Sequence, residues 1–273
     1  MHRAVRSGYA SRFASLLAFV VALAGFDASA GDPPVFGYGV MFSNATQSYD
    51  FATFPLVTPF APLDAQLVAA TAVGNNHARL QAIDAGGNLV TVDTATGGVS
   101  LVGPLGIGPQ QRVSIAADPG TGALFVIAGD SNCFLTVLYS VDPATGLATP
   151  VTPLPECVAA VAADVAHQLL YFLDEGAAAV NVVDAQGNET TLGDLGVVPN
   201  ASARIMIDPV SGGLFMTQFE FPTFSNSLYA IDTASGAASF VMDIGGANPL
   251  GAPVLAPPQG VLIDRIFSDG FDP

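Results

Sequence analysis

The sequence predicts an all-β protein of short antiparallel strands, and three observations support that fold class. The chain of 273 residues contains 29 glycines and 20 prolines, which interrupt helices and mark tight turns. Only 11% of its residues are charged, so few are available for the polar face of amphipathic helices. After Gly31, no segment of about ten residues or more places apolar side chains at the helical period of 3.6.

One phrase recurs along the chain. It reads L-V-T-V-D-T-A-T-G from Leu89, L-Y-S-V-D-P-A-T-G from Leu138 and L-Y-A-I-D-T-A-S-G from Leu228, with a looser copy, V-N-V-V-D-A-Q-G-N, from Val180. Its aspartates, Asp93, Asp142, Asp184 and Asp232, are 49, 42 and 48 residues apart. A second marker, Leu80, Leu124, Leu170 and Leu214, has spacings of 44, 46 and 44. The chain is therefore a tandem repeat with a period of about 45 residues.

Each repeat contains four strand-like segments separated by turns. In one unit these are V-S-I-A-A-D, A-L-F-V-I-A-G, L-T-V-L-Y-S-V-D and L-A-T-P-V, between Val113 and Val151. Four strands in about 45 residues is the pattern of a β-propeller blade. Many of these segments are apolar at consecutive positions, as expected for a sheet that is buried on both faces.

The number of units predicts how the ring closes. Full units begin near Leu67, Arg112, Val158 and Arg204, whereas residues 36 to about 60 supply only the last three strands of a unit. The segment Ala252 to Pro258 occupies the place of a first strand. We therefore predict a five-bladed β-propeller of four-stranded antiparallel blades, closed by the C-terminal strand joining the N-terminal blade. A sixth, truncated blade that begins at Val261 is the alternative.

The phrases L-Y-x-[IV]-D-x-x-[ST]-G and D-P-x-[ST]-G-x-L-F resemble those of secreted propeller repeat proteins of the YVTN and quinoprotein-repeat type. The resemblance covers residues 36–258 and implies the architecture rather than an activity. The chain contains no tryptophan, so the tryptophans of quinoprotein repeats are missing and we expect no quinone or other cofactor.

Turn chemistry explains why the aspartates recur. In D-T-A-S-G and D-P-A-T-G, an Asp side chain can accept hydrogen bonds from the turn backbone, and Gly supplies a positive φ. The same turn recurs as D-P-G-T-G from Asp118 and D-P-V-S-G from Asp208. We expect both kinds of turn on one face of the propeller. Because their carboxylates already cap turns, we expect no metal site among them.

The N-terminal 30 residues have the pattern of a signal peptide. Arg3, Arg6 and Arg12 precede the apolar run from Ser15 to Gly25, and Ala28-Ser29-Ala30 is a small-x-small cleavage site. The apolar run is too short to span a membrane. We expect cleavage before Gly31, a propeller domain over residues 31–258, a C-terminal tail over residues 259–273, and a secreted or periplasmic protein.

The charge of the chain excludes two classes of partner. The net charge is −16, and residues 1–30 carry three of the seven basic residues but only one of the 23 acidic ones. The negative field repels phosphate backbones and anionic lipids, so we expect no nucleic-acid or membrane partner. A monomer that binds an unknown protein or glycan is the expectation.

Cys133 and Cys157 fall in loops that the blade pattern places on the same face. In an oxidising compartment they are expected to form a disulfide, which closes a loop of about 25 residues and contributes about 3 kcal/mol. Two buried free thiols are the alternative.

Residues suited to catalysis are few. His77 and His167 lie at matching positions, three residues before Leu80 and Leu170, where the pattern predicts a turn. No nucleophile-elbow, zinc-protease or phosphate-loop motif occurs. The chain is therefore expected not to be an enzyme. The alternative is a hydrolase or lyase acting on a sugar or lactone at the channel mouth, with Asp130, Glu156 and Glu220 as acid or base candidates.

A candidate binding surface includes the loop F-E-F-P-T-F-S-N. It contains Phe219, Glu220, Phe221 and Phe224, and Arg112 and Arg204 are expected near the same face. Exposed aromatic side chains suit a protein or sugar ligand, and the arginines suit an anion. Alternatively, the rings plug the channel mouth or extend the strand, and the arginines neutralise nearby carboxylates. The leading hypothesis is a secreted, non-catalytic binding module; a cell-surface structural protein positioned by its tail is a further alternative.

Overall fold

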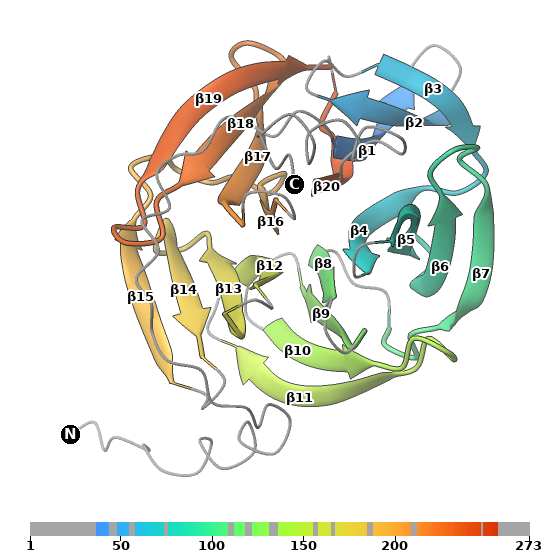
Figure 1. The fold of residues 1–273 in the computed structure, drawn as a ribbon, viewed down its shortest axis with the longest axis horizontal. Helices are drawn as coiled ribbons and strands as arrows, with labels where there is room; N and C mark the ends of the chain where they lie inside the picture. The colour runs from blue at the N-terminus through green and yellow to red at the C-terminus, as the bar shows by residue number, and fades with distance from the viewer. Residues whose placement is uncertain are drawn as a thin grey trace, which may run out of the picture.

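In the computed structural model, the described residues are 37–43, 48–54, 58–73, 76–108, 112–117, 122–130, 136–154, 158–164, 167–184, 188–208, 212–246 and 248–255. Every element in these ranges is a β-strand, and the strands form four-stranded antiparallel sheets arranged around a central axis (Figure 1). The predicted all-β propeller with four-stranded blades is confirmed. Within these ranges, no helix is long and apolar enough to cross a membrane.

In each sheet, one strand lies nearest the axis and three others follow outwards. From the inside out, one sheet consists of β20 (Gly251–Leu255), β1 (Gly37–Ser43), β2 (Ser48–Phe54) and β3 (Thr58–Leu63). The next two are β4 (Leu67–Val73), β5 (Asn76–Asp84), β6 (Asn88–Asp93) and β7 (Val99–Pro104), then β8 (Arg112–Ala117), β9 (Leu124–Gly129), β10 (Thr136–Val141) and β11 (Ala148–Leu154). The remaining two are β12 (Val158–Asp164), β13 (Leu169–Asp174), β14 (Ala179–Val183) and β15 (Glu189–Asp194), then β16 (Arg204–Ile207), β17 (Leu214–Glu220), β18 (Ser225–Ile231) and β19 (Ala238–Gly245).

The innermost strands contact one another in sequence around the axis. Strand β4 contacts β8, β8 contacts β12 and β12 contacts β16, while β20 contacts both β16 and β4. Strand β20 also pairs with β1, so that Gly37 lies opposite Leu255. A C-terminal strand therefore completes the sheet of the N-terminal strands, at the place where the sequence lacked a first strand. The alternative blade beginning at Val261 lies outside the described residues.

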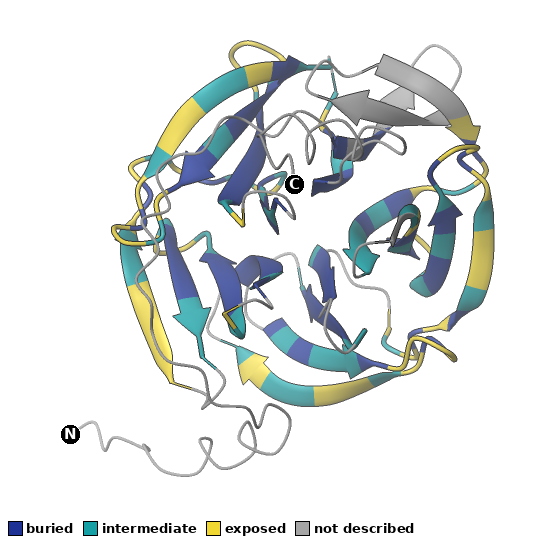
Figure 2. Ribbon diagram, in the orientation of Figure 1, coloured by how far each residue is buried: buried dark blue, intermediate teal, exposed yellow. Residues whose placement is uncertain are grey.

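The hydrophobic core lies between neighbouring sheets. One cluster joins Val126 of β9 to Ile83 of β5, and another joins Phe172 of β13 to Ile127 of β9. Because each sheet packs on two neighbours, all six residues of β9 are buried, as the consecutive apolar residues predicted. The four marker leucines of the repeat are all buried. Burial decreases outwards, and the outermost strands carry most of the exposed strand residues (Figure 2).

The recurring aspartates cap turns, as predicted. Asp93 Oδ1 accepts hydrogen bonds from the backbone N–H groups of Ala95 and Thr96 at 3.0 and 2.9 Å. Asp142 and Asp232 accept equivalent bonds. The last glycines of these turns have positive φ values of 72° at Gly97, 80° at Gly146 and 79° at Gly236.

Two of these turns also pack directly against the backbone of the neighbouring blade, which the turn chemistry did not predict. Gly103, in β7, lies so close to the turn after β10 that an added Cβ would be 2.1 Å from the carbonyl oxygen of Thr145. Gly193, in β15, has the same relation to Ser235, again at 2.1 Å. Next to these contacts, Ala148 and Ala238 donate backbone hydrogen bonds to Leu105 O and Leu195 O. Two blade interfaces therefore include direct backbone packing that leaves no room for a side chain.

The turn aspartates should make stability acid-sensitive. Hydrogen bonds from the turn hold the pKa of Asp93, Asp142 and Asp232 below the ordinary value of 3.8; the largest cause is the hydroxyl of Thr96 for Asp93, the backbone N–H of Ala144 for Asp142 and the hydroxyl of Ser235 for Asp232. A lowered folded-state pKa gives stability that is present above the unfolded pKa and lost as pH falls through the folded one. We expect the triple Asp→Asn variant, which retains capping side chains, to lose less stability between pH 5 and pH 2, measured by urea unfolding. Glu189→Gln, on an exposed strand, is the control; parallel losses in the triple variant and the wild type would contradict this account.

Candidate functional site

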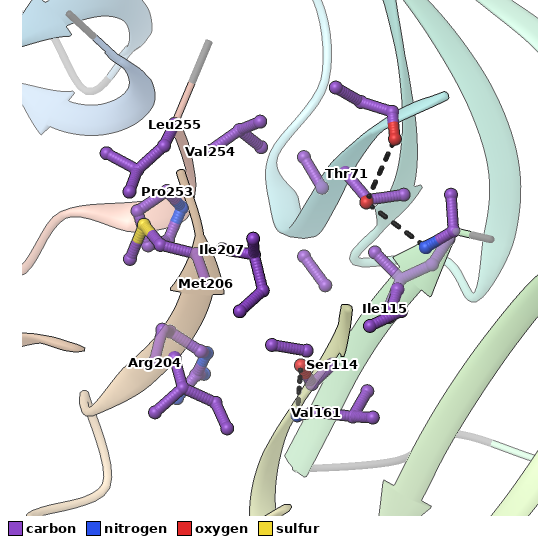
Figure 3. A pocket seen from close by; sticks show the side chains of 18 of the residues that line it. Thr71, Ser114, Ile115, Val161, Arg204, Met206, Ile207, Pro253, Val254 and Leu255 are labelled. Carbon is purple, nitrogen blue, oxygen red and sulfur yellow. Dashed lines mark hydrogen bonds between the residues drawn. The ribbon is translucent and has the colours of Figure 1, made fainter. Parts of the chain in front are cut away.

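A cavity of about 220 Å³ lies on the propeller axis and is lined by the innermost strands (Figure 3). Its walls are mostly small or apolar side chains, including Ala69, Ile115, Val161 and Val254. Small residues recur in the first strand of each unit because the inner strands converge there and leave little room for larger side chains. The cavity is therefore narrow and mainly hydrophobic.

Two hydroxyl groups in the cavity wall link neighbouring inner strands. Ser114 Oγ on β8 accepts a hydrogen bond from Val161 N on β12 at 3.1 Å, and Thr71 Oγ1 on β4 accepts one from Ala117 N on β8 at 3.3 Å (Figure 3). Thr71 Oγ1 also donates to Ala72 O. These hydroxyls satisfy backbone groups and are engaged in holding blades together.

A cluster of three charged side chains lies at the start of the inner strands, and one of them, Arg204, lines the cavity. Arg112 and Arg204 are the first residues of β8 and β16, so both lie at the end of the inner strands where the sequence placed them. Arg112 Nη1 donates to Glu175 Oε2 at 2.6 Å, an ion pair in which both side chains are largely buried. Arg112 therefore neutralises a nearby carboxylate, which was one of the two roles expected for the arginines. Glu175 follows β13 and was not among the predicted site residues.

Arg204 lines the cavity itself (Figure 3). Its Nη1 donates to Ala203 O at 2.7 Å and to Ala201 O at 3.1 Å, so the chain that leads into β16 holds the guanidinium in place. Burial lowers the pKa of Arg204, while the charge of Glu175 raises it and that of Arg112 lowers it. The three charged groups therefore act on one another at this end of the channel.

Carboxylates occupy the opposite end of the cavity. Asp164 ends β12 and Asp208 follows β16, and both are buried. Asp164 accepts hydrogen bonds from the backbone N–H and the Nδ1 of His167, the latter at 2.8 Å. Burial, with the charge of Asp164, raises the pKa of Tyr171 to about 12. His167 lies in the predicted turn, whereas His77 lies within β5, so the turn predicted for His77 is wrong.

The aromatic loop forms a tight hairpin between β17 and β18. Phe219 pairs with Asn226 and Glu220 with Ser225 in the ladder, which leaves residues 221–224 as the turn. Phe219 is only 3% exposed, so one predicted surface ring belongs to the strand, as the strand-extension alternative held. Phe221 and Phe224 are 62% and 65% exposed. Their rings lie edge-on to Phe219, with centroids 5.4 and 6.4 Å away.

Hydrogen bonds fix the base of this hairpin. Phe219 N donates to Ser202 Oγ at 2.9 Å, and Asn200 Nδ2 donates to Phe219 O at 2.9 Å. On the other face of the strand, Tyr229 OH donates to Glu220 Oε1 at 2.7 Å. Burial and this bond raise the pKa of Tyr229 to about 12. Glu220 is thus occupied in positioning the hairpin.

The other predicted residues are separated from this arrangement or lie outside it. Cys133, Cys157 and Glu156 lie outside the described residues, so the disulfide stays a prediction. Asp130 follows β9, and neither it nor Glu220 is among the described residues that line the cavity. The described residues contain no group of three or more His, Cys, Asp or Glu side chains that could hold a metal ion.

Comparisons with known proteins give similarities of fold at low sequence identity. No protein-family model matches the chain, and no curated protein matches it. A chain in the crystal structure of a nidogen/laminin complex superposes with a TM-score of 0.53 at 11% identity, covering 81% of this chain and 98% of that one. TolB from Acinetobacter baumannii gives a TM-score of 0.49 at 11% identity, over 84% and 68% of the two chains. Regucalcin from Agrobacterium tumefaciens gives 0.45 at 14% identity, over 77% and 74%. The similarity to the chain of the nidogen/laminin complex agrees with the β-propeller fold and, at 11% identity, carries no activity.

Proposed function

We propose that the chain is a secreted, non-catalytic β-propeller with five blades that binds a protein through its aromatic hairpin. The observation that carries the proposal is the pair of exposed rings, Phe221 and Phe224, supported from below by buried Phe219. Large aromatic side chains are common anchors of protein interfaces. An exposed pair at a loop tip has no role in the core of its own chain.

The hairpin is suited to binding because it is already ordered. The β17–β18 ladder continues to Glu220 and Ser225, and the bonds from Asn200 and Ser202 fix the strand end. A partner would therefore immobilise few additional groups, each of which costs about 0.5–1.5 kcal/mol on binding. The fixed base favours recognition without large rearrangement.

The contacts of β20 support a ring complete with five blades. This strand pairs with β1 and contacts β4 on one side and β16 on the other. The N-terminal pattern of Arg3, Arg6, Arg12 and the following apolar run supports secretion. The proposed mature protein begins at Gly31, and its tail, residues 259–273, follows the propeller.

The experiment is an affinity capture from the secreted fraction with the variant Phe221→Ser/Phe224→Ser. We expect the wild type to retain a specific protein and the variant to bind it at least tenfold more weakly, because anchor residues commonly contribute about 2 kcal/mol or more each. The control is Leu101→Ser, which removes a 69% exposed apolar side chain from β7, the outer strand of another blade. Unfolding free energies should change by no more than about 1 kcal/mol.

Equal binding by the wild type, the double variant and the control would remove the hairpin from the interface. Loss of binding in the Leu101 variant alone would move the interface to the outer edge of the propeller. A glycan array with the same three proteins separates the ligand classes, since glycan binding that requires Phe221 and Phe224 would replace the protein ligand with a sugar.

A further inference from the structure

Arg204 Nε, a buried donor on a residue that lines the cavity, has no hydrogen-bond partner among the described residues. A buried charged donor without a partner destabilises the folded chain. Because this donor belongs to the cavity wall, an acceptor bound in the cavity could satisfy it.

The charge of the cluster indicates the sign of that group. Arg112 and Arg204 carry two positive charges and Glu175 carries one negative charge, so the cluster has a net positive charge in an acidic protein. Arg112 is already paired with Glu175, whereas the Nε of Arg204 has no partner in the described part of the chain. One added anion beside Arg204 would give two cations and two anions and would accept the unused hydrogen bond.

The cavity indicates the shape of the ligand. A volume of about 220 Å³ corresponds to about seven groups the size of water, at roughly 30 Å³ each. The cavity walls also include Ile205 and Met206, which follow Arg204 on β16, and Val161 on β12; these side chains suit a hydrocarbon chain. Asp164 and Asp208 at the opposite end disfavour a second negative charge. A compact apolar molecule with one anionic end fits these constraints.

We propose that the channel binds a small aliphatic monocarboxylate, with its carboxylate on Arg204 Nε and its hydrocarbon chain along the propeller axis. The ligand class is an organic acid of about six to eight non-hydrogen atoms, set by the cavity volume. Arg204 is the binding residue, and the charges of Arg112 and Glu175 act on its guanidinium. The proposal for this site does not depend on the function proposed for the aromatic hairpin.

The test is calorimetric titration of the full chain with butyrate and hexanoate, compared with hexanamide and inorganic phosphate. We expect hexanoate to bind with a Kd between about 10 μM and 1 mM, since ligands of this size are limited to modest affinity. Hexanamide has the same shape without the charge, and phosphate has the charge without the chain; both should bind at least tenfold more weakly. Hexanamide or phosphate binding as tightly as hexanoate would overturn the proposal, and so would a lack of binding by both butyrate and hexanoate.

The variant Arg204→Gln should weaken hexanoate binding at least tenfold. Arg79→Gln, which removes an exposed arginine from β5, is the matched control and should bind like the wild type. If Arg204→Gln does not fold, Arg204→Lys keeps the charge but lacks the Nε donor, and should also weaken binding. Unchanged affinity in the folded Arg204 variant would place the ligand elsewhere. Unchanged hexanoate binding by Phe221→Ser/Phe224→Ser would show that the two sites are separate, and loss of binding would overturn that separation.

Discussion

A chain that ends at Leu250 is expected to lose cooperative unfolding. Strand β20 supplies Ala252 and Val254 to the cluster it shares with β4, and Leu255 to the cluster it shares with β17. Its removal exposes both clusters and leaves β1 without an inner partner. The expected loss exceeds about 4–5 kcal/mol, comparable to the whole stability of many domains, which is about 5–15 kcal/mol. Circular dichroism with urea titration measures it.

The matched control is a chain that ends at Pro258. It retains β20 and lacks only the proposed tail, so its urea midpoint should equal that of the full chain. A sharp, unshifted transition in the Leu250 truncation would show that the ring does not depend on β20. A large loss in the Pro258 truncation would place part of the folded domain in residues 259–273.

The second change with a large expected effect is alanine at Gly103 or Gly193, the two glycines that pack against a turn of the neighbouring blade. In both Gly103→Ala and Gly193→Ala, the new Cβ would lie 2.1 Å from a backbone oxygen, which cannot move without shifting a turn of the next blade. Gly193 also has φ at +153°, a conformation that alanine rarely adopts. We expect losses of about 2–4 kcal/mol for each variant in the free energy of unfolding, measured by urea titration.

Gly108→Ala is the control for this pair. Among the described residues outside its chain neighbours, no heavy atom lies within 4 Å of the position that its Cβ would take, so the cost should stay below about 0.5 kcal/mol. Equal urea midpoints for Gly103→Ala and Gly108→Ala would mean that the contact between Gly103 and the neighbouring blade can open without loss of stability.

The repeat made the strand order predictable from the sequence. The segments read between Val113 and Val151 match β8 to β11 closely, because strands buried on both faces leave long apolar runs bounded by Asp and Gly turns. The strand ends next to loops were less predictable. Phe219 belongs to β17 because the ladder continues past the apolar run to Glu220, and ladder length depends on cross-strand partners rather than on local sequence.

The site was predictable only in part. Arg112 and Arg204 could be placed at one end of the inner strands by blade register, but their partner Glu175 could not, since it belongs to a third blade. Its position in the loop after β13, on the blade between those of the two arginines, is the signal that could have found it. Gly103 and Gly193 also share a sequence pattern. The segments G-P-L-G from Gly103 and G-D-L-G from Gly193 occupy the same place in their repeats, which could have indicated that both glycines have the same structural role.

The pairing of Gly37 with Leu255 gives the propeller a mechanical seam. The first and last described residues lie side by side at one end of the β1–β20 ladder. A force that pulls Gly37 and Leu255 apart would break the hydrogen bonds of the β1–β20 ladder one after another, as in a zipper. The other blades, whose strands are joined by loops, would come under load only after this ladder had opened. The adjacent ends also suit circular permutation: a short linker between them would turn the seam into an ordinary blade, and a new opening in another loop would move it.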